Sequence, residues 1–251
     1  MPMPLIVREI EARTALSVSK VCDYALNPYV GCEHGCTYCY ARFMRRFTGH
    51  REPWGTFVDA KVNLPSLLAR ELARRRPGTV WLSGVCDPYQ PLEARYRLTR
   101  RCLALLVESG WPVAVQTRSP LVLRDLYLLA AAPALDVTVT VTTADDRVRR
   151  LFEPQAPPVT ARLRALARLH RAGVRTVAMI APLLPGAERL PEALAGLVHE
   201  VLVDRLNYHY ADRVYARHGL QGARQEAFFR ETAAALAAAF AARSVPCRVL
   251  F

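Results

Sequence analysis

Long apolar segments are missing from this sequence of 251 residues. A membrane-spanning helix needs about 20 consecutive apolar residues, and the alanine-rich stretch 232–242 is too short for that. The first residues also lack a basic segment followed by an apolar one, so no secretory signal peptide is expected. These absences predict a protein that has no membrane partner and is located in the cytoplasm.

Lysine is nearly absent as well. Of the 34 basic residues only Lys20 and Lys61 are lysines, and the 22 acidic residues leave a net charge of +12. An excess of positive charge favours a polyanionic partner such as nucleic acid, and arginine binds phosphate groups in a bidentate manner. A GC-rich genome also produces abundant arginine, alanine and leucine, so the composition favours a nucleic acid without establishing one.

Cysteine is present, but it does not form the framework of a disulfide-stabilised protein. Three of the seven cysteines lie between residues 32 and 39, and a chain without a secretion signal is expected in a reducing compartment. Cys32, Cys36 and Cys39 have the spacing C-x3-C-x2-C, and Gly31 and Gly35 beside them allow the unusual backbone angles of a tight loop. If Cys36 and Cys39 begin a helix, they share one of its faces. Clustered thiolates select iron–sulfur clusters or zinc, and three ligands leave one position open to another ligand.

A structural zinc site is the alternative interpretation of these cysteines. His34 or Cys22 would then supply the fourth ligand, because structural zinc is usually held by four protein side chains. The chain would in that case be a zinc-stabilised nucleic-acid-binding module without enzymatic turnover.

The residues around the cysteines resemble those of a known family. Tyr38 precedes the third cysteine, and this aromatic residue and the spacing resemble the motif of the radical S-adenosylmethionine (SAM) superfamily. The flanking segments 27–32 and 40–42, with the sequences NPYVGC and YAR, look like the branch related to spore photoproduct lyase. The resemblance extends over residues 21–206 and includes DPYQP at 87–91, SPLVLRDL at 119–126, FEP at 152–154 and AP at 181–182.

This resemblance implies a 4Fe-4S cluster held by Cys32, Cys36 and Cys39, with SAM bound to the fourth iron. Enzymes of this family cleave SAM reductively to methionine and a 5′-deoxyadenosyl radical, which abstracts hydrogen from a substrate. The implied SAM contacts are Tyr38, Ala181 and Pro182 at the adenine, Ser83 and Gly84 at the methionyl amino group, Arg118 at the carboxylate, and Thr142 at the ribose or carboxylate. These contacts are chemically coherent, because a guanidinium group suits a carboxylate and a backbone pressed against a ligand favours glycine.

Segments rich in β-branched residues alternate with amphipathic segments along the chain. The predicted strands are 25–30, 79–83, 113–117, 137–142, 175–180 and 200–206, and the helical segments between them include 64–75, 98–108, 121–131 and 160–172. Such alternation predicts an α/β protein with a parallel sheet and helices outside it. Six units fit an incomplete (β/α)6 barrel of the TIM type, as the radical SAM resemblance also implies, with its site at the carboxyl ends of the strands. We expect residues 1–20 to form an N-terminal arm, 21–206 the partial barrel, and 207–251 a helical extension packed on the barrel.

The resemblance favours a nucleic-acid substrate, such as a DNA photolesion or a modified base, repaired in the manner of spore photoproduct lyase. Radical modification of a peptide or a small molecule is the alternative. The other expected partner is an electron donor such as flavodoxin or ferredoxin. This sequence departs from that of spore photoproduct lyase in two features that affect the substrate assignment. Residues 209–251 lack the aromatic and basic hairpin of the lyase, and Gly84 stands where the lyase has a hydrogen-donating cysteine.

Cys86 lies two residues after Gly84, and residues with this spacing face the same side of an extended segment. We therefore expect its thiol to return hydrogen to the product radical, with Tyr40 or Tyr89 as a relay. The alternative is that Cys86 only begins the turn at Asp87.

An aromatic and basic segment follows the last predicted strand. The run Tyr208-His209-Tyr210 lies near Arg205 and Arg213 in the sequence. It either stacks against nucleic-acid bases or forms an ordinary rim of the barrel.

Overall fold

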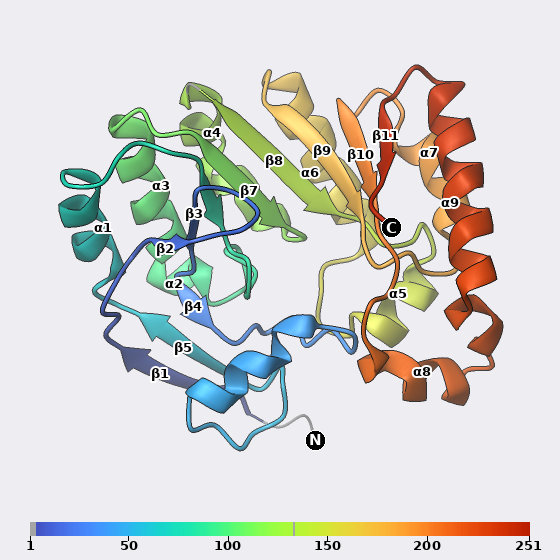
Figure 1. Cartoon of the computed structure of the whole chain (residues 1–251), viewed down its shortest axis with the longest axis horizontal. Coiled ribbons are helices and arrows are strands. Elements are labelled where there is room, and N and C mark those ends of the chain that lie inside the picture. The colour runs from blue at the N-terminus through green and yellow to red at the C-terminus, as the bar shows by residue number, and fades with distance from the viewer. Residues whose placement is uncertain (1–3, 133) are drawn as a thin grey trace.

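The larger of two sheets forms the frame of the protein. The computed structural model describes residues 4–132 and 134–251, so residues 1–3 of the expected arm lie outside the described part (Figure 1). The larger sheet has the strand order β2-β3-β6-β7-β8-β9-β10-β11. Every neighbouring pair from β3 to β11 is parallel, and β2 joins β3 antiparallel at one edge. The strands are β2 (Ser17–Val18), β3 (Tyr24–Leu26), β6 (Val80–Leu82), β7 (Val113–Thr117), β8 (Leu135–Thr140), β9 (Arg175–Ile180), β10 (Glu200–Val203) and β11 (Cys247–Val249).

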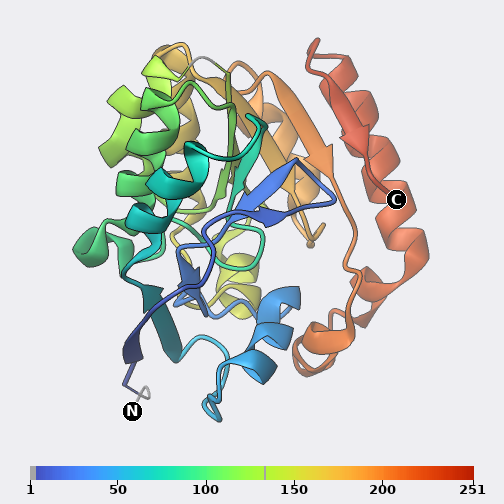
Figure 2. The ribbon, with the colours of Figure 1, turned by 60° about the vertical axis from the view of Figure 1, so that its left-hand side comes forward.

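Helices cover the outer face of this curved sheet (Figure 2). They include α1 (Leu64–Leu72), α3 (Leu98–Glu108), α4 (Leu126–Ala131), α6 (Val159–Arg171), α7 (Leu190–Leu194) and α9 (Glu226–Ala241). In α3 the buried residues Leu98, Cys102 and Leu106 recur every four positions, which makes one apolar stripe that packs on the core. In β7 burial alternates along the strand, so Val113 and Val115 pack into the core while Gln116 faces the opposite side. The expected α/β fold with parallel strands and outer helices is confirmed.

The strand predicted at residues 25–30 is divided between the two sheets. Its first part is β3, and its last two residues form β4 (Tyr29–Val30) in the smaller sheet. Asn27 and Pro28 lie between the two strands, and proline lacks the N–H that a continuous ladder needs. The chain therefore leaves the larger sheet shortly before the first cysteine.

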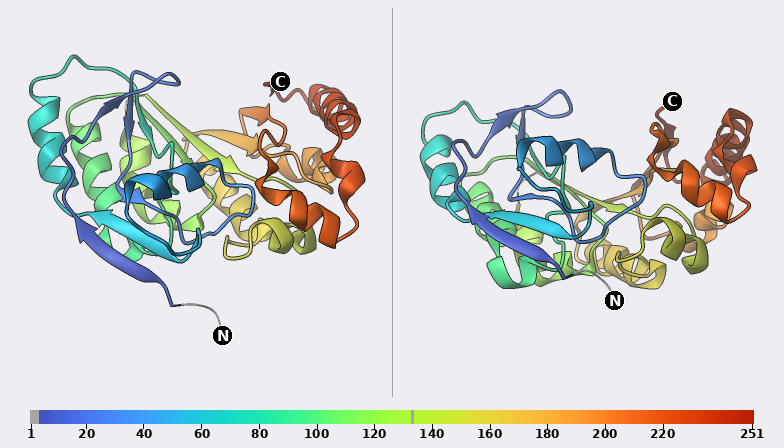
Figure 3. Two further views of the ribbon diagram at one scale, coloured as in Figure 1. Left: turned by 60° about the horizontal axis from the view of Figure 1, so that its bottom comes forward. Right: turned by 90° about the horizontal axis from the view of Figure 1, so that it is seen from below.

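The smaller sheet has the order β1-β5-β4 and lies beside the segment that follows the cysteines (Figures 1 and 3). β1 (Ile6–Ile10) pairs parallel with β5 (Phe57–Lys61), and β4 pairs antiparallel with β5. The segment expected to be an N-terminal arm thus contributes β1 to this sheet and β2 to the larger one.

The last part of the chain contains more than helices. After α8 (Asp212–Arg217) and α9, the chain returns as β11, which pairs parallel with β10 at the edge of the larger sheet. Phe229, Leu236 and Phe240 of α9 are buried. Among the described helices, none is both long enough and apolar enough to span a bilayer.

Gly31 makes the sharp turn from β4 into the cysteine loop. Its φ is +90°, which is unfavourable for any residue with a side chain, and a Cβ there would lie 2.4 Å from the carbonyl oxygen of Phe57. The smaller sheet and the cysteine loop therefore require glycine at this position.

We predict that Gly31→Ala destabilises the protein by at least about 2 kcal/mol, because backbone strain and a clash with β5 add together. Gly110→Ala is the matched control, since Gly110 has a φ of +69° but a Cβ there would have no atom within 4 Å. The control should cost only about 1 kcal/mol. Urea unfolding of both variants measures the difference, and equal losses would contradict the clash.

Candidate functional site

The three clustered cysteines lie on the loop between β4 and the 3-10 helix η1 (Tyr40–Phe47). Two reverse turns shape this loop, because the Gly35 N–H donates to the Cys32 carbonyl at 3.3 Å and the Cys39 N–H donates to the Cys36 carbonyl at 3.2 Å. All three cysteines line one cavity. The expectation that Cys36 and Cys39 begin a helix is wrong, because η1 starts only at Tyr40 and consecutive turns bring the thiols to one side instead.

This cavity lies at the carboxyl ends of the parallel strands, where the sequence predicted the site. Its lining joins the cysteine loop to residues from the ends of β6, β7, β8, β9 and β10. Eight further candidates from the sequence line it: Tyr38, Tyr40, Ser83, Gly84, Cys86, Arg118, Ala181 and Pro182. The structure thus brings together predicted residues as far apart in the sequence as Cys32 and Pro182.

Thr142 and Tyr89 are the two candidates that lie outside this cavity. Thr142 is 1% exposed, and its hydroxyl donates to a carboxylate oxygen of Glu153 at 2.9 Å, while Thr140 lines the cavity in its place. Tyr89 is fully buried, with the guanidinium carbon of Arg124 6.0 Å from its ring centroid. The structure therefore places Thr142 and Tyr89 behind the residues that line the cavity.

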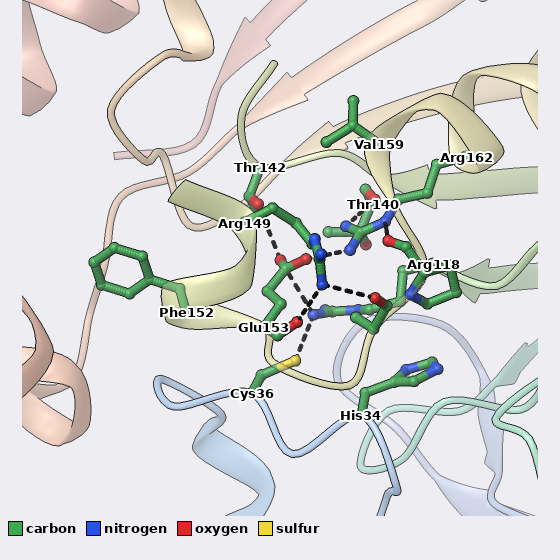
Figure 4. A network of polar contacts seen from close by, with 12 residues as sticks. His34, Cys36, Arg118, Thr140, Thr142, Arg149, Phe152, Glu153, Val159 and Arg162 are labelled. Carbon is green, nitrogen blue, oxygen red and sulfur yellow. Dashed lines mark hydrogen bonds and ion pairs between the residues drawn. The ribbon is translucent and has the colours of Figure 1, made fainter. Parts of the chain in front are cut away.

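A buried carboxylate, Glu153, holds one wall of the cavity together (Figure 4). It accepts hydrogen bonds from Tyr38, Arg162 and Thr142, and Arg118 Nη1 lies 3.4 Å from its Oε1. Burial alone would raise the pKa of Glu153, but the guanidinium groups of Arg162 and Arg118 lower it to about 2. Glu153 is therefore ionised. The sequence analysis assigned it no role, although the FEP match at 152–154 marked its position.

Glu153 fixes Arg118 against the loop that carries the three cysteines. Arg118 Nη1 lies 2.7 Å from Cys36 Sγ and 2.9 Å from the Tyr38 hydroxyl oxygen (Figure 4). Burial raises the pKa of the Cys36 thiol to about 12, and the positive charge of Arg118 opposes this increase. A guanidinium group in this position stabilises the thiolate that a metal needs.

A second buried carboxylate, Asp87, joins three loops. Its side chain accepts hydrogen bonds from the Thr117 hydroxyl at 2.6 Å and the Arg118 N–H at 2.9 Å, and its Oδ2 lies 3.4 Å from His34 Nδ1. Burial alone would raise the pKa of Asp87, but His34 and these hydrogen bonds lower it to about 2.

Gln90 adds a further connection between the DPYQP segment and the cysteine loop. Its side chain accepts a hydrogen bond from the Glu33 N–H at 3.0 Å and donates one to the Gly31 carbonyl at 3.3 Å. Gln90 is fully buried, so these bonds are shielded from water. This segment therefore orients the loop that carries the three cysteines.

Two buried N–H groups around the cysteines have no partner among the described residues. They are Nε1 of Trp54 and Nε of Arg42, whereas Nδ1 of His34 faces Asp87. His34 and Trp54 line the cavity. Buried donors without acceptors are costly, and the sulfur atoms of an iron–sulfur cluster accept such hydrogen bonds. The donor set therefore fits a cluster.

A single zinc ion fits these residues less well. Within residues 4–132 and 134–251, no three side chains of histidine, cysteine, aspartate or glutamate are arranged to hold one metal ion. In a four-iron cube each thiolate binds a different iron, so the three sulfurs need not converge on one point. Neither His34 nor Cys22 completes a zinc site with the three cysteines.

The comparison with known protein families decides between these interpretations. The family model of the radical SAM superfamily matches residues 26–193. The chain belongs to the radical SAM superfamily. Its members use a 4Fe-4S cluster and SAM, which confirms the cofactors and the enzyme class expected from the sequence.

Relatives of this radical SAM protein occur in archaea, bacteria and a phage. An uncharacterised protein of Methanocaldococcus jannaschii is 32% identical over 179 residues, which cover 70% of this chain and 67% of the relative. An uncharacterised protein of Mycobacterium tuberculosis is 35% identical over 185 residues, which cover 71% of this chain but only 54% of the relative. The radical SAM Nalpha-GlyT isomerase of Pseudomonas phage M6 is 28% identical over 162 residues, which cover 63% of this chain and 33% of the relative.

Among solved structures, spore photoproduct lyase complexed with dinucleoside spore photoproduct has a similar fold. Its TM-score is 0.72 at 15% sequence identity, and the match covers 98% of this chain and 82% of the lyase chain. The similarity therefore extends beyond the radical SAM domain to the last strand and helices.

We predict that anaerobically purified protein is brown and carries about four iron and four sulfide per chain. Changing Cys32, Cys36 or Cys39 to alanine should abolish the colour, because each removes a thiolate ligand. Cys22→Ala is the matched control and should keep it, since Cys22 does not line the cavity. Metal analysis and sulfide determination test this prediction, and one zinc per chain without sulfide would contradict it.

We predict that Glu153→Gln lowers the free energy of unfolding by about 3–5 kcal/mol, because Arg162 is left buried without a counter-charge. Glu153 has a folded-state pKa of about 2 against an ordinary value of 4.5, so its stabilisation is present above pH 4.5 and is lost as the pH falls toward 2. The difference between the variant and the parent should shrink over that interval. Urea unfolding at several pH values measures it.

The exposed Glu226 provides the control for this charge removal, because it also pairs with arginine. Glu226→Gln should leave the free energy of unfolding nearly unchanged. Similar losses in both variants would show that burial of the Glu153 ion pair is not the cause.

Proposed function

We propose that this radical SAM enzyme abstracts a hydrogen atom from a nucleic-acid base and returns one from Cys86, as in a lyase-like repair reaction. The observation that carries the proposal is the position of Cys86. Its thiol lines the same cavity as the three cluster cysteines, yet it lies on a different loop, after β6. The site therefore contains a fourth cysteine that cluster binding does not use.

When bound, the cluster and SAM supply a 5′-deoxyadenosyl radical that removes hydrogen from the substrate. Cys32, Cys36 and Cys39 would hold the cluster. Lining residues of the cavity remain the proposed contacts to SAM: Tyr38, Ala181 and Pro182 at the adenine, Ser83 and Gly84 at the amino group, and Arg118 at the carboxylate. Arg118 is partly exposed on the cavity side, so its guanidinium can reach a carboxylate there while Glu153 holds it.

The surroundings of Cys86 keep its sulfur protonated. Burial raises the pKa of the Cys86 thiol to about 11, and this effect outweighs the opposing hydrogen bond with the Ser83 hydroxyl, whose oxygen lies 3.3 Å from the Cys86 sulfur. At neutral pH the side chain is thus a thiol, and its weak S–H bond can break to give a hydrogen atom to a carbon-centred radical. One S–H bond breaks, one C–H bond forms, and a thiyl radical remains on Cys86.

Tyr40 is placed to restore this thiol. Its hydroxyl donates a hydrogen bond to the Gly84 carbonyl, and its ring lines the cavity that contains Cys86. The Tyr40 O–H would give a hydrogen atom to the thiyl radical, and the resulting tyrosyl radical would take up one electron and one proton. Tyr40 is 42% exposed, so solvent can supply the proton and a flavodoxin or ferredoxin the electron. Tyr89 is fully buried away from the cavity, so the relay is assigned to Tyr40 alone.

Three observations support a nucleic-acid base as the substrate, and a fourth supports the return of hydrogen. The chain has a net charge of +12, which attracts a polyanion. Tyr40 and Tyr208 line the cavity with aromatic faces against which a base can stack. The structural neighbour was solved with a dinucleoside photoproduct. The phage relative is named an isomerase, and an isomerisation that begins with removal of hydrogen must end with its replacement. We place this activity in the cytoplasm, where iron–sulfur clusters and thiols stay reduced.

The substrate proposal is tested by anaerobic assay with dithionite, SAM and ultraviolet-irradiated DNA. Irradiated DNA should increase the release of 5′-deoxyadenosine above the rate with SAM alone, and a changed base should appear in the digested product. No stimulation by irradiated or modified nucleic acid would contradict the substrate class while leaving the cofactor assignment intact.

In such an active assay, Cys86→Ala should shift the products from the hydrogen-quenched base to trapped radical adducts, because no S–H bond is available to the product radical. Mass spectrometry of the digested nucleic acid measures the ratio. Cys247→Ala is the matched control, since this partly buried cysteine lies on β11 and does not line the cavity. An unaltered product profile in Cys86→Ala would reduce Cys86 to a turn residue.

A further inference from the structure

Three tyrosines and one arginine form a continuous stack at the edge of the cavity, which we call the tyrosine ladder (Tyr40, Tyr208, Tyr210 and Arg42). The rings of Tyr40 and Tyr208 have centroids 6.3 Å apart with an interplanar angle of 20°. The rings of Tyr208 and Tyr210 are 5.7 Å apart and nearly parallel, at 5°. The guanidinium carbon of Arg42 lies 5.5 Å from the Tyr210 centroid.

The ladder connects two parts of the chain on opposite sides of the cavity. Tyr40 and Arg42 belong to η1, whereas Tyr208 and Tyr210 lie in the segment between β10 and α8, and Figure 2 shows these two segments facing one another. Tyr40 and Tyr208 line the cavity, but Tyr210 does not. The ladder therefore leads from the proposed site of hydrogen transfer to the outer surface.

The three tyrosines of the ladder are more exposed to solvent than aromatic residues that only stabilise a core. Tyr40, Tyr208 and Tyr210 are 42%, 48% and 44% exposed. In the described part of the chain the hydroxyls of Tyr208 and Tyr210 make no hydrogen bond to other residues, so polar contacts do not explain their placement. Aromatic rings stabilise a protein when they are buried away from water. The ladder rings remain largely in contact with water, so burial contributes less to their placement.

Positive charge surrounds the ladder without being neutralised. Arg42 donates from Nη2 to the Cys36 carbonyl at 3.2 Å but has no carboxylate partner among the described residues. Arg45 and Arg46 on η1 and Arg213 on α8 also lack a carboxylate partner there. The acidic residue nearest in the sequence, Asp212, is engaged by Arg224 and His209. Arginines that are free of carboxylates can bind phosphate groups.

We propose that the tyrosine ladder binds an unpaired nucleic-acid strand beside the reacting base. The bases that flank the reacting one would stack on the parts of Tyr208 and Tyr210 that the ladder leaves exposed, since these residues are 48% and 44% exposed, and Arg42 would contact the phosphate between them. In a duplex both faces of each base are covered by its neighbours, so stacking on a tyrosine requires a strand that is locally unpaired. This inference rests on the proposed function, and it adds how the strand is held and in which state.

Fluorescence anisotropy tests the proposal with the anaerobic, cluster-loaded enzyme and a labelled single-stranded oligothymidylate. The single strand should bind more tightly than a hairpin duplex of the same length. Tyr208→Ala and Tyr210→Ala should each weaken binding of the single strand roughly 5- to 100-fold, because each removes a stacking surface. Tyr210→Phe keeps the ring and should bind like the parent.

Two controls separate loss of stacking from loss of structure. Iron content and cluster absorbance of each variant show whether the site has formed. Tyr127→Ala removes another exposed tyrosine, which is 58% exposed on α4 and does not line the cavity, and it should leave the affinity unchanged.

The possible outcomes distinguish the ladder from the proposed function. If the single strand binds and stimulates SAM cleavage, but the alanine variants bind it as tightly as the parent, the ladder proposal is overturned and the proposed function stands. Tighter binding of the duplex than of the single strand also overturns the ladder proposal. If the parent binds neither nucleic acid but binds a basic or acidic test peptide, both the ladder and the nucleic-acid substrate are wrong.

Discussion

The site depends on one buried ion pair, between Glu153 and Arg162. Both side chains are fully buried, and desolvating two charges costs several kcal/mol per ion unless each is closely paired. Glu153 meets this requirement with Arg162, Arg118, Tyr38 and Thr142, which come from α6, the end of β7, the cysteine loop and the segment after β8. Because every partner stabilises the same carboxylate, the four segments are held in one arrangement, and Arg118 is held next to Cys36.

A second set of contacts positions the cysteine loop from the other side. Asp87 and Gln90, on the loop after β6, bond to the end of β7 and to the backbone around Gly31 and Glu33. These bonds join protein groups to one another and leave the Nε1–H of Trp54, a residue that lines the cavity, without an acceptor. The loop is thus preorganised by its neighbours, while this unpaired donor remains for the sulfur atoms of the cluster.

Local patterns in the sequence predict the larger sheet, but they do not predict long-range pairing. The strand at 113–117 and the helix at 98–108 were predicted at their observed positions. Their apolar residues follow the local spacing of a strand and of a helix, and these residues are buried in the structure. The smaller sheet was missed, because β1 and β5 are about fifty residues apart and no local sequence pattern indicates that they pair. For the site, the cysteines were found because their spacing is local. Glu153 was missed and Thr142 was given a different role, because the partner of a buried polar group is decided by the fold.

The cavity lining combines charged and aromatic side chains. The cysteines, Arg118 and Asp87 give it a charged, largely buried surface, which Glu153 supports from behind. Tyr40 and Tyr208 add aromatic rings that are more than 40% exposed, and Cys86 lies in the same lining on the loop after β6. A thiol kept protonated by burial can donate hydrogen only to a radical that forms within its reach. Under the proposed function, a substrate that contacts Tyr40 and Tyr208 would therefore have to present its reacting carbon close to Cys86.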